Sequence, residues 1–173
     1  EAISGPCRVK FEADSVDGSI RLAGSRIDDL SLRKHFLTVE KTQEVRLFRP
    51  ESAEYGYFAT YYWADGKALV AGRNSPWVQV GGRELTPSTP ITLRLETDGL
   101  TIERTISVDK DYMFSFEDTL TNTGSSERVV RAIGSVERHG AYKDFLEVTD
   151  PGSATASNLA HQGLMGVVDG ELR

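Results

Sequence analysis

Apolar and polar residues alternate along most of the chain, which is the pattern of β-strands with one buried face. The run 91–97 alternates in this way, the dipeptide Asp98-Gly99 follows, and a second alternating run covers 100–108. Two alternating runs joined by Asp-Gly predict a β-hairpin. The run 9–13 alternates on the same period ahead of another such pair, Asp17-Gly18, where the pattern predicts a second turn.

Further segments have the composition of strands. An aromatic cluster at 55–63 is typical of a buried strand, 112–121 places three aromatic residues on one face, and 129–136 resumes after a polar turn. The segment 30–41 fits either a short helix or a strand. Residues 74–90 contain three prolines and predict an irregular, loop-rich surface region.

These elements define an all-β fold with little helix. About a dozen strands separated by Gly, Pro, Asn and Asp turns indicate a large antiparallel β-sandwich. No linker divides the chain, so we expect a single domain over residues 1–173. The chain closes on an Asp-Gly turn signal and the start of another strand, which indicates a piece of a longer protein.

Composition narrows the classes of partner. The formal net charge is −6, and the basic residues are scattered singly or in pairs. A nucleic-acid-binding surface needs clustered positive charge, so we expect no nucleic acid partner. No apolar run approaches the roughly 18 residues of a membrane-spanning helix, so we expect no direct membrane insertion. The single cysteine, Cys7, excludes an internal disulfide and a multi-cysteine metal site, and we expect it to be buried.

No catalytic or metal-binding motif is present. His35, His139 and His161 are widely separated and lack the paired spacing of metal-ligating histidines. The glycine–serine pairs lack the flanking residues of a nucleophile elbow, and no glycine-rich phosphate loop occurs. A glycosidase-like carboxylate pair remains an open alternative among 26 acidic residues. We expect no catalytic residue, no metal and no cofactor.

Two arginines stand on the apolar phase of predicted strands. Arg104 is in phase with Ile102 and Ile106, and Arg138 is in phase with Val136. A charge on a buried face is costly unless it is paired or opens to a solvated cleft. One interpretation is therefore a buried salt bridge, or an arginine that lies past the end of its strand.

The other interpretation of these arginines is a polar groove on the sheet. Arg104 and Arg138 would supply its charges, and Trp63, Trp77 and the pair Tyr61-Tyr62 would supply its apolar walls. Such a groove would receive an extended peptide or a sugar.

Several phrases follow one another in an order that is specific although each phrase alone is weak. They are GSIRLAGSRIDDLSL at 18–32, VRLFRP at 45–50, YFATYYW at 57–63, LTPSTPITL at 85–93, GLTIERTISVDKDYMF at 99–114, NTG at 122–124, RHG at 138–140 and HQGLMGV at 161–167. Together they resemble the large periplasmic loop of YidC-type membrane protein insertases, and the opening phrase is most similar to α-proteobacterial members. Ser25, Ser88 and Gln162 depart from residues that are usual in the family.

The resemblance implies an antiparallel β-super-sandwich like that of galactose mutarotases. It implies a place between the first two transmembrane helices, on the periplasmic side of the bacterial inner membrane, and a domain that continues past Arg173. The implied function is a docking or scaffold module, without catalysis, of an insertase that assists insertion and folding of membrane proteins. The implied partners are the parent transmembrane helices, and either Sec translocon accessory subunits or nascent membrane proteins.

Two other interpretations stay open. One is a carbohydrate-binding or mutarotase-like enzyme domain, which needs a histidine and a carboxylate aimed at the sugar ring. His139 and His161 are the late-chain candidates for that histidine, and neither has the flanking residues of such enzymes. The other is a purely structural spacer.

Overall fold

The computed structural model describes residues 7–66, 68–141, 167–168 and 171–172, and over these residues every regular element is a β-strand. The strands are β1 (Arg8–Glu12), β2 (Val16–Arg21), β3 (Arg26–Phe36), β4 (Glu44–Phe48), β5 (Tyr57–Asp65), β6 (Ala68–Ala71), β7 (Val78–Gly81), β8 (Ile91–Thr97), β9 (Leu100–Val108), β10 (Phe114–Asn122), β11 (Val130–Arg138), β12 (Val167–Val168) and β13 (Glu171–Leu172). The predicted all-β class is confirmed. None of the described segments forms a helix with the length and hydropathy that crossing a membrane requires.

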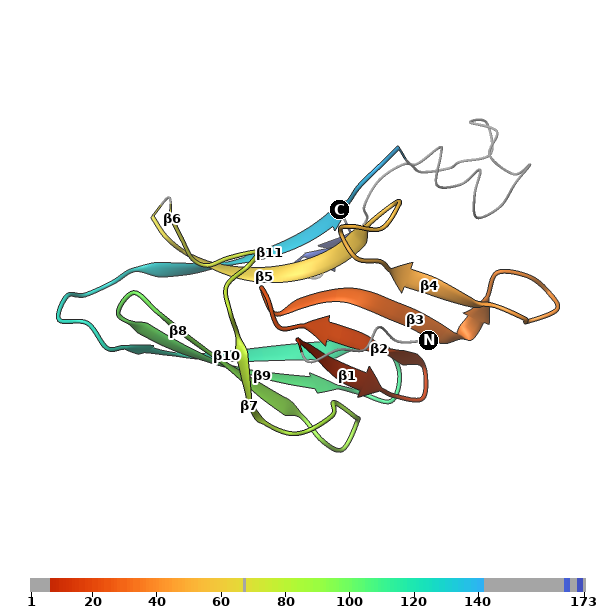
Figure 1. Cartoon of the computed structure of the whole chain (residues 1–173), viewed down its shortest axis with the longest axis horizontal. Helices are drawn as coiled ribbons and strands as arrows, with labels where there is room; N and C mark the ends of the chain where they lie inside the picture. The colour runs from red at the N-terminus through yellow and green to blue at the C-terminus, as the bar shows by residue number, and fades with distance from the viewer. Residues whose placement is uncertain (1–6, 67, 142–166, 169–170, 173) are drawn as a thin grey trace. The chain divides into compact units, whose positions relative to one another are not determined.

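The first eleven strands form two antiparallel sheets (Figure 1). The first sheet has the order β1-β2-β3-β5-β11, with β4 beside β3 and β6 beside β5, and the second has the order β10-β9-β8-β7. These strands belong to the unit 1–139, whereas β12 and β13 pair with each other in the unit 140–173. The two sheets make the predicted antiparallel sandwich.

The hydrophobic core lies between the two sheets. It is built from Val9, Phe11, Val16, Ile20, Ile27 and Leu30 of the first sheet and Ile91, Leu93, Leu95, Ile102, Ile106 and Val108 of the second. Strands β8 and β9 bury alternate residues, as their period predicts. Their hairpin turn is Asp98-Gly99, because Thr97 pairs with Leu100 and Gly99 has φ = +72°. The sequence prediction of this hairpin is confirmed.

The predicted turn at Asp17-Gly18 is wrong, since both residues lie inside β2. Residues 13–15 make the turn instead, where Ala13 N donates to the carbonyl oxygen of Val16 at 2.8 Å. Gly18 serves close packing: a Cβ there would lie 2.0 Å from the Asp29 carbonyl oxygen. A glycine inside a strand often marks a close backbone approach of this kind.

The region 74–90 is more ordered than its prolines predict. It contains β7, and its residues Trp77 and Leu85 are only 3% and 0% exposed. Leu85 exchanges two backbone hydrogen bonds with the edge of β1, at 2.9 and 3.0 Å. The expectation of a surface loop is therefore wrong for these residues, because pairing with a sheet edge carries their side chains into the core.

Two smaller expectations are also settled. Of the segment 30–41, open to helix or strand, residues 30–36 are the second half of β3, and residues 37–41 follow that strand outside any regular element. Cys7 is exposed, not buried, because it precedes β1 at the edge of the first sheet.

Candidate functional site

The first charged cluster, here called the inner cluster, consists of Arg104, Asp118, Trp63 and Trp77. Arg104 on β9 and Asp118 on β10 face each other as cross-strand partners. The guanidinium donates from Nε to Asp118 Oδ1 at 2.8 Å and from Nη2 to Oδ2 at 2.7 Å. Trp63 Nε1 donates to the same Oδ2 at 2.6 Å. The Arg104 and Asp118 side chains are 0% and 10% exposed, so this is a buried, bidentate ion pair.

Aromatic rings enclose the Arg104 guanidinium. Its central carbon lies 4.7 Å from the centroid of the Trp77 ring, 5.8 Å from that of Phe116 and 6.0 Å from that of Tyr61. Desolvated contacts of this kind stabilise an arginine through the ring quadrupole. A pocket of about 210 Å³ borders the cluster and is lined by residues of β5, β9, β10 and β11.

Of the residues predicted to form a groove, the structure thus brings together Arg104, Trp63, Trp77 and Tyr61. The buried salt bridge that was the alternative interpretation of Arg104 is present. Ligand binding at this cluster stays a prediction.

Arg138 lies apart from the inner cluster. It is the exposed last residue of β11, with its guanidinium carbon 4.6 Å from the centroid of the Tyr57 ring. The burial expected from its phase is wrong, because the apolar phase of β11 is itself open to solvent, with Val136 46% exposed. Within the described residues β11 pairs with β5 on one edge, and its other edge is open. A single neighbouring strand is not enough to bury the side chains of β11.

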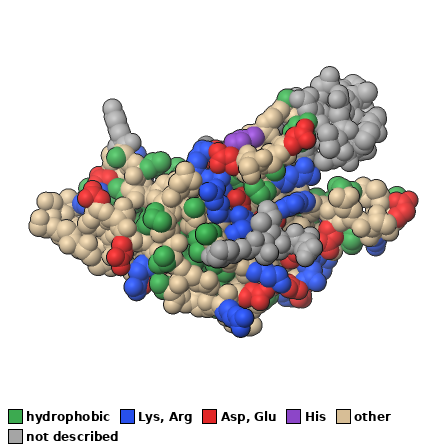
Figure 2. Space-filling model, viewed as in Figure 1, with side chains coloured by type: hydrophobic (Ala, Val, Ile, Leu, Met, Phe, Trp, Pro, Cys, Tyr) green, Lys and Arg blue, Asp and Glu red, His purple; other side chains and the backbone are tan. Residues whose placement is uncertain are grey.

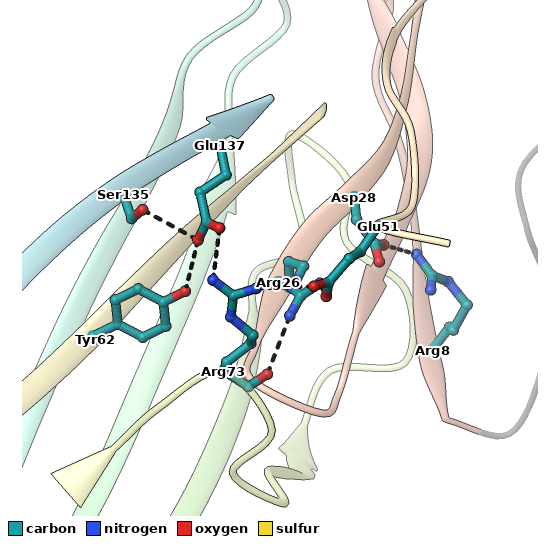
Figure 3. Close-up of polar contacts among 8 residues, drawn as sticks. All are labelled: Arg8, Arg26, Asp28, Glu51, Tyr62, Arg73, Ser135 and Glu137. Carbon is teal, nitrogen blue, oxygen red and sulfur yellow. Dashed lines mark hydrogen bonds and ion pairs between the residues drawn. The ribbon is translucent and has the colours of Figure 1, made fainter. Parts of the chain in front are cut away.

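A second set of charges covers the face of the first sheet that points away from the core. This outer cluster consists of Arg8, Arg26, Asp28, Glu51, Arg73 and Glu137, all of which Figure 3 shows. In Figure 2 basic and acidic side chains lie next to one another in the middle of the view.

A break in strand register places several of these groups. Between β2 and β3 the pairing shifts, so that Ser19 faces Asp29 while Ile20 faces Ile27. The extra residue is Asp28, and such a bulge re-aims the side chains around it. Asp28 forms an ion pair with Arg8, and Asp29 accepts from Ser19 Oγ at 2.6 Å.

Glu51 and Glu137 are the shared acceptors of the outer cluster. Glu51 accepts from Arg26 Nη1 at 2.8 Å and from Arg73 Nη1 at 2.9 Å. Arg73 also donates from Nη2 to Glu137 Oε2 at 2.6 Å, and the Tyr62 hydroxyl donates to Glu137 Oε1 at 3.2 Å. The two carboxylates are therefore held by donors from three separate segments (Figure 3).

Arg26 is the buried centre of the outer cluster. Its side chain is 0% exposed, and its guanidinium carbon lies 4.4 Å from the centroid of the Phe58 ring. The hydrogen bond that Arg26 donates lowers the pKa of the Glu51 carboxyl, and the charge of Arg73 adds to the effect. A general acid at neutral pH needs the opposite shift, so Glu51 is poorly suited to that role.

In the part of the chain that the structure describes, no three His, Cys, Asp or Glu side chains come together as a group that could hold a metal ion. His35 Nε2 lies 3.1 Å from the Tyr112 hydroxyl, and His139 packs edge-on against Phe58 at 5.3 Å between ring centroids. His161 lies outside the described residues.

Sequence reasoning missed the outer cluster. One signal was available, since Arg26 and Asp28 flank the core residue Ile27 and so fall on the polar phase of β3. Glu51 and Glu137 come from distant segments, and no local pattern marks them as partners of Arg26.

Fold and clusters together define a two-sheet β domain whose buried charges neutralise one another within the domain. Comparison with known proteins agrees with that class and makes it specific. The family model described as "YidC periplasmic domain" matches residues 8–173. The chain therefore belongs to the family of YidC periplasmic domains.

Curated relatives of this chain are named "Membrane protein insertase YidC". One from Brucella suis biovar 1 is 39% identical over 171 residues, which cover 96% of this chain and 27% of the relative. One from Jannaschia sp. is 38% identical, over 99% of this chain and 27% of the relative. One from Caulobacter sp. is 36% identical, over 98% of this chain and 27% of the relative. The chain thus spans about a quarter of the length of these relatives, which are mostly α-proteobacterial, as the opening phrase predicted.

Proposed function

We propose that this chain is the periplasmic docking and scaffold domain of an inner-membrane insertase, and that it assists insertion and folding of membrane proteins without catalysis. The observation that carries the proposal is the family match over residues 8–173, together with relatives named as membrane protein insertases. Because the chain corresponds to 27% of such a relative, the parent transmembrane helices are the first proposed partner. Sec translocon accessory subunits and nascent membrane proteins are the next.

The charge arrangement supports a role without catalysis. Asp118 accepts hydrogen bonds from Arg104 and Trp63, and Glu51 accepts them from Arg26 and Arg73. Carboxylates fixed in this way resist the proton transfers that general acid–base catalysis needs. Such networks stiffen a surface instead, which suits a module that presents a fixed face to partners.

The test uses the full-length parent insertase, with and without this domain, reconstituted in proteoliposomes. Loss of the domain is expected to reduce co-purification with translocon accessory subunits and to lower the yield of folded test membrane protein. A deletion that leaves both measurements unchanged would show that the domain is only a spacer.

A second measurement addresses catalysis directly. Purified chain is expected to leave the rate of aldose mutarotation at its uncatalysed value, measured by polarimetry on glucose and galactose. An accelerated rate that disappears on His139→Ala would overturn the proposal in favour of a mutarotase-like enzyme.

A further inference from the structure

Three arginines lie directly opposite one another across neighbouring strands. Arg8 of β1 pairs in register with Arg21 of β2, and Arg21 pairs in register with Arg26 at the start of β3. Side chains in such positions have Cβ atoms about 5 Å apart on one face of a sheet, and like charges there repel. A row of three is therefore unfavourable unless each charge is compensated.

Two of the three charges are compensated within the domain, and the middle one is not. Arg8 pairs with Asp28, and Arg26 pairs with Glu51. Arg21 is half-buried, and among the described residues its side chain has no ion-pair or hydrogen-bond partner.

The ion pairs of the wider outer face leave Arg21 as an exception. Around it, Arg8, Arg26, Arg46 and Arg73 pair with Asp28, Asp29, Glu51 and Glu137. Arg21 takes part in none of these pairs, and neither does Asp17, which lies on the same face of β2 opposite Glu12. Arg21 is thus the arginine of this set that lacks a counter-charge among the described residues, in a chain whose formal net charge is −6.

Arg21 also borders a pocket of a size that fits a ligand. The pocket has a volume of about 510 Å³ and is lined by Arg8, Arg21, Asp28, Pro50, Glu51 and Ser52. Small-molecule and side-chain sites in proteins span about 300–1,000 Å³. Its walls are rigid, because the Asp28 side chain is 2% exposed and Glu51 is clamped by Arg26 and Arg73.

We propose that the Arg21 pocket binds a single carboxylate carried by a polypeptide segment. Arg21 supplies the uncompensated guanidinium, whose planar fork matches a carboxylate. Glu51, whose side chain is 36% exposed, adds acceptor oxygens on the same wall, which suit the backbone N–H groups that flank an acidic side chain. Glu51 repels any anion in the pocket, but a polypeptide brings N–H donors that offset this repulsion, whereas a lipid phosphodiester offers acceptors alone. The site stands on the pocket itself and does not depend on a role in membrane protein insertion.

The experiment is a titration of the ¹⁵N-labelled chain, followed by NMR, with the peptides acetyl-Gly-Glu-Gly-amide and acetyl-Gly-Gln-Gly-amide. The acidic peptide is expected to give saturable shifts in β1, β2 and the start of β3, with an affinity about tenfold above that of its neutral isostere. Arg21→Gln is expected to abolish the difference between the peptides, and Arg21→Lys to retain part of it. Arg83→Gln is the matched control, because it removes one exposed arginine outside the pocket and is expected to change nothing.

Stability separates a lost site from a misfolded variant. Removing the uncompensated charge from the row is expected to leave the Tm of Arg21→Gln equal to or above that of the parent chain, while binding is lost. Equal affinity for both peptides, or undiminished binding by Arg21→Gln, would overturn the proposal. A third result would also overturn it: the chain does not bind the acidic peptide, but it sediments with phosphatidylglycerol vesicles and loses this property in Arg21→Gln. That result would assign the pocket to lipid headgroups.

Discussion

The inner and outer clusters each contain an arginine that is 0% exposed, yet the two arginines are used in opposite ways. Arg104 donates from Nε and from one Nη to a single carboxylate, Asp118, which is 10% exposed. Arg26 donates to a carboxylate that is 36% exposed and shared with Arg73, and its own Nε has no hydrogen-bond partner among the described residues.

The difference shows what burial of an arginine does in each place. Between the sheets, Arg104 and Asp118 are neighbours in register and complete each other, so the pair acts as a closed structural unit. On the outer face, Glu51 and Glu137 accept from donors of several segments, and one arginine of the same face, Arg21, has no counter-charge among the described residues. A closed pair specifies the packing of the sandwich, whereas an open network leaves capacity for a ligand.

The largest expected effect comes from breaking the closed pair. Arg104→Met removes the only guanidinium that contacts Asp118 in the described structure and strands a nearly buried carboxylate. Loss of one partner from a buried ion pair costs about 3–5 kcal/mol, so the free energy of unfolding should fall by that amount in urea denaturation.

Two matched variants sharpen that result. Arg104→Met combined with Asp118→Leu should recover much of the loss, because no buried charge is left unpaired. Arg94→Met, on the next strand, breaks an exposed pair with Glu103 in which both side chains are 42% exposed, and should cost less than about 1 kcal/mol. An Arg104→Met chain as stable as the Arg94→Met chain would contradict the assignment of a closed pair.

The second effect is smaller and tests the open network. Arg26→Met should lower the free energy of unfolding by about 1–3 kcal/mol, the cost of a charged hydrogen bond, because Glu51 keeps Arg73 and stays in contact with water. The same urea denaturation measures it. Should Arg26→Met prove as damaging as Arg104→Met, the outer cluster would be a closed unit too, and the distinction between the two would fail.

The sequence predicted much more of the inner cluster than of the outer one, for a physical reason. Strand phase marks Arg104 as buried, and the hairpin at Asp98-Gly99 fixes the register of β8 and β9. A buried arginine on a strand must find a carboxylate nearby, so one local pattern predicts most of the arrangement. The partner, Asp118, lies 14 residues away on the adjacent strand.

The outer cluster depends on features that the alternation of apolar and polar residues along the sequence does not reveal. The bulge at Asp28 breaks the period of two, and it is visible only once β2 and β3 are paired. Glu51 and Arg73 belong to connections between strands, whose course depends on tertiary contacts. The same limit explains why the positions of Gly18 and Leu85 were predicted wrongly. The close backbone approach at Gly18 and the sheet-edge pairing of Leu85 are contacts between segments that are distant in the sequence.

The smallest expected effect is a pH dependence that belongs to the open network. The hydrogen bond from Arg26, with the charges of Arg26 and Arg73, lowers the pKa of Glu51 in the folded chain below its unfolded value. The contribution of Glu51 is then fully present above the unfolded pKa and is lost as pH falls through the folded one. The difference in free energy of unfolding between the parent chain and Glu51→Gln should be largest near pH 7 and should shrink below about pH 4.

Repeating the same pH series in the Arg26→Met background separates the network from general acid effects. The hydrogen bond from Arg26 is the largest cause of the lowered pKa, so the pH-dependent part of the Glu51→Gln difference should be smaller without Arg26. If the pH-dependent part of the Glu51→Gln difference stayed the same without Arg26, Arg73 alone would hold the Glu51 carboxylate. Arg26 would then be a buried arginine stacked on Phe58 with little electrostatic hold on Glu51, and the outer face would be more open than its distances indicate.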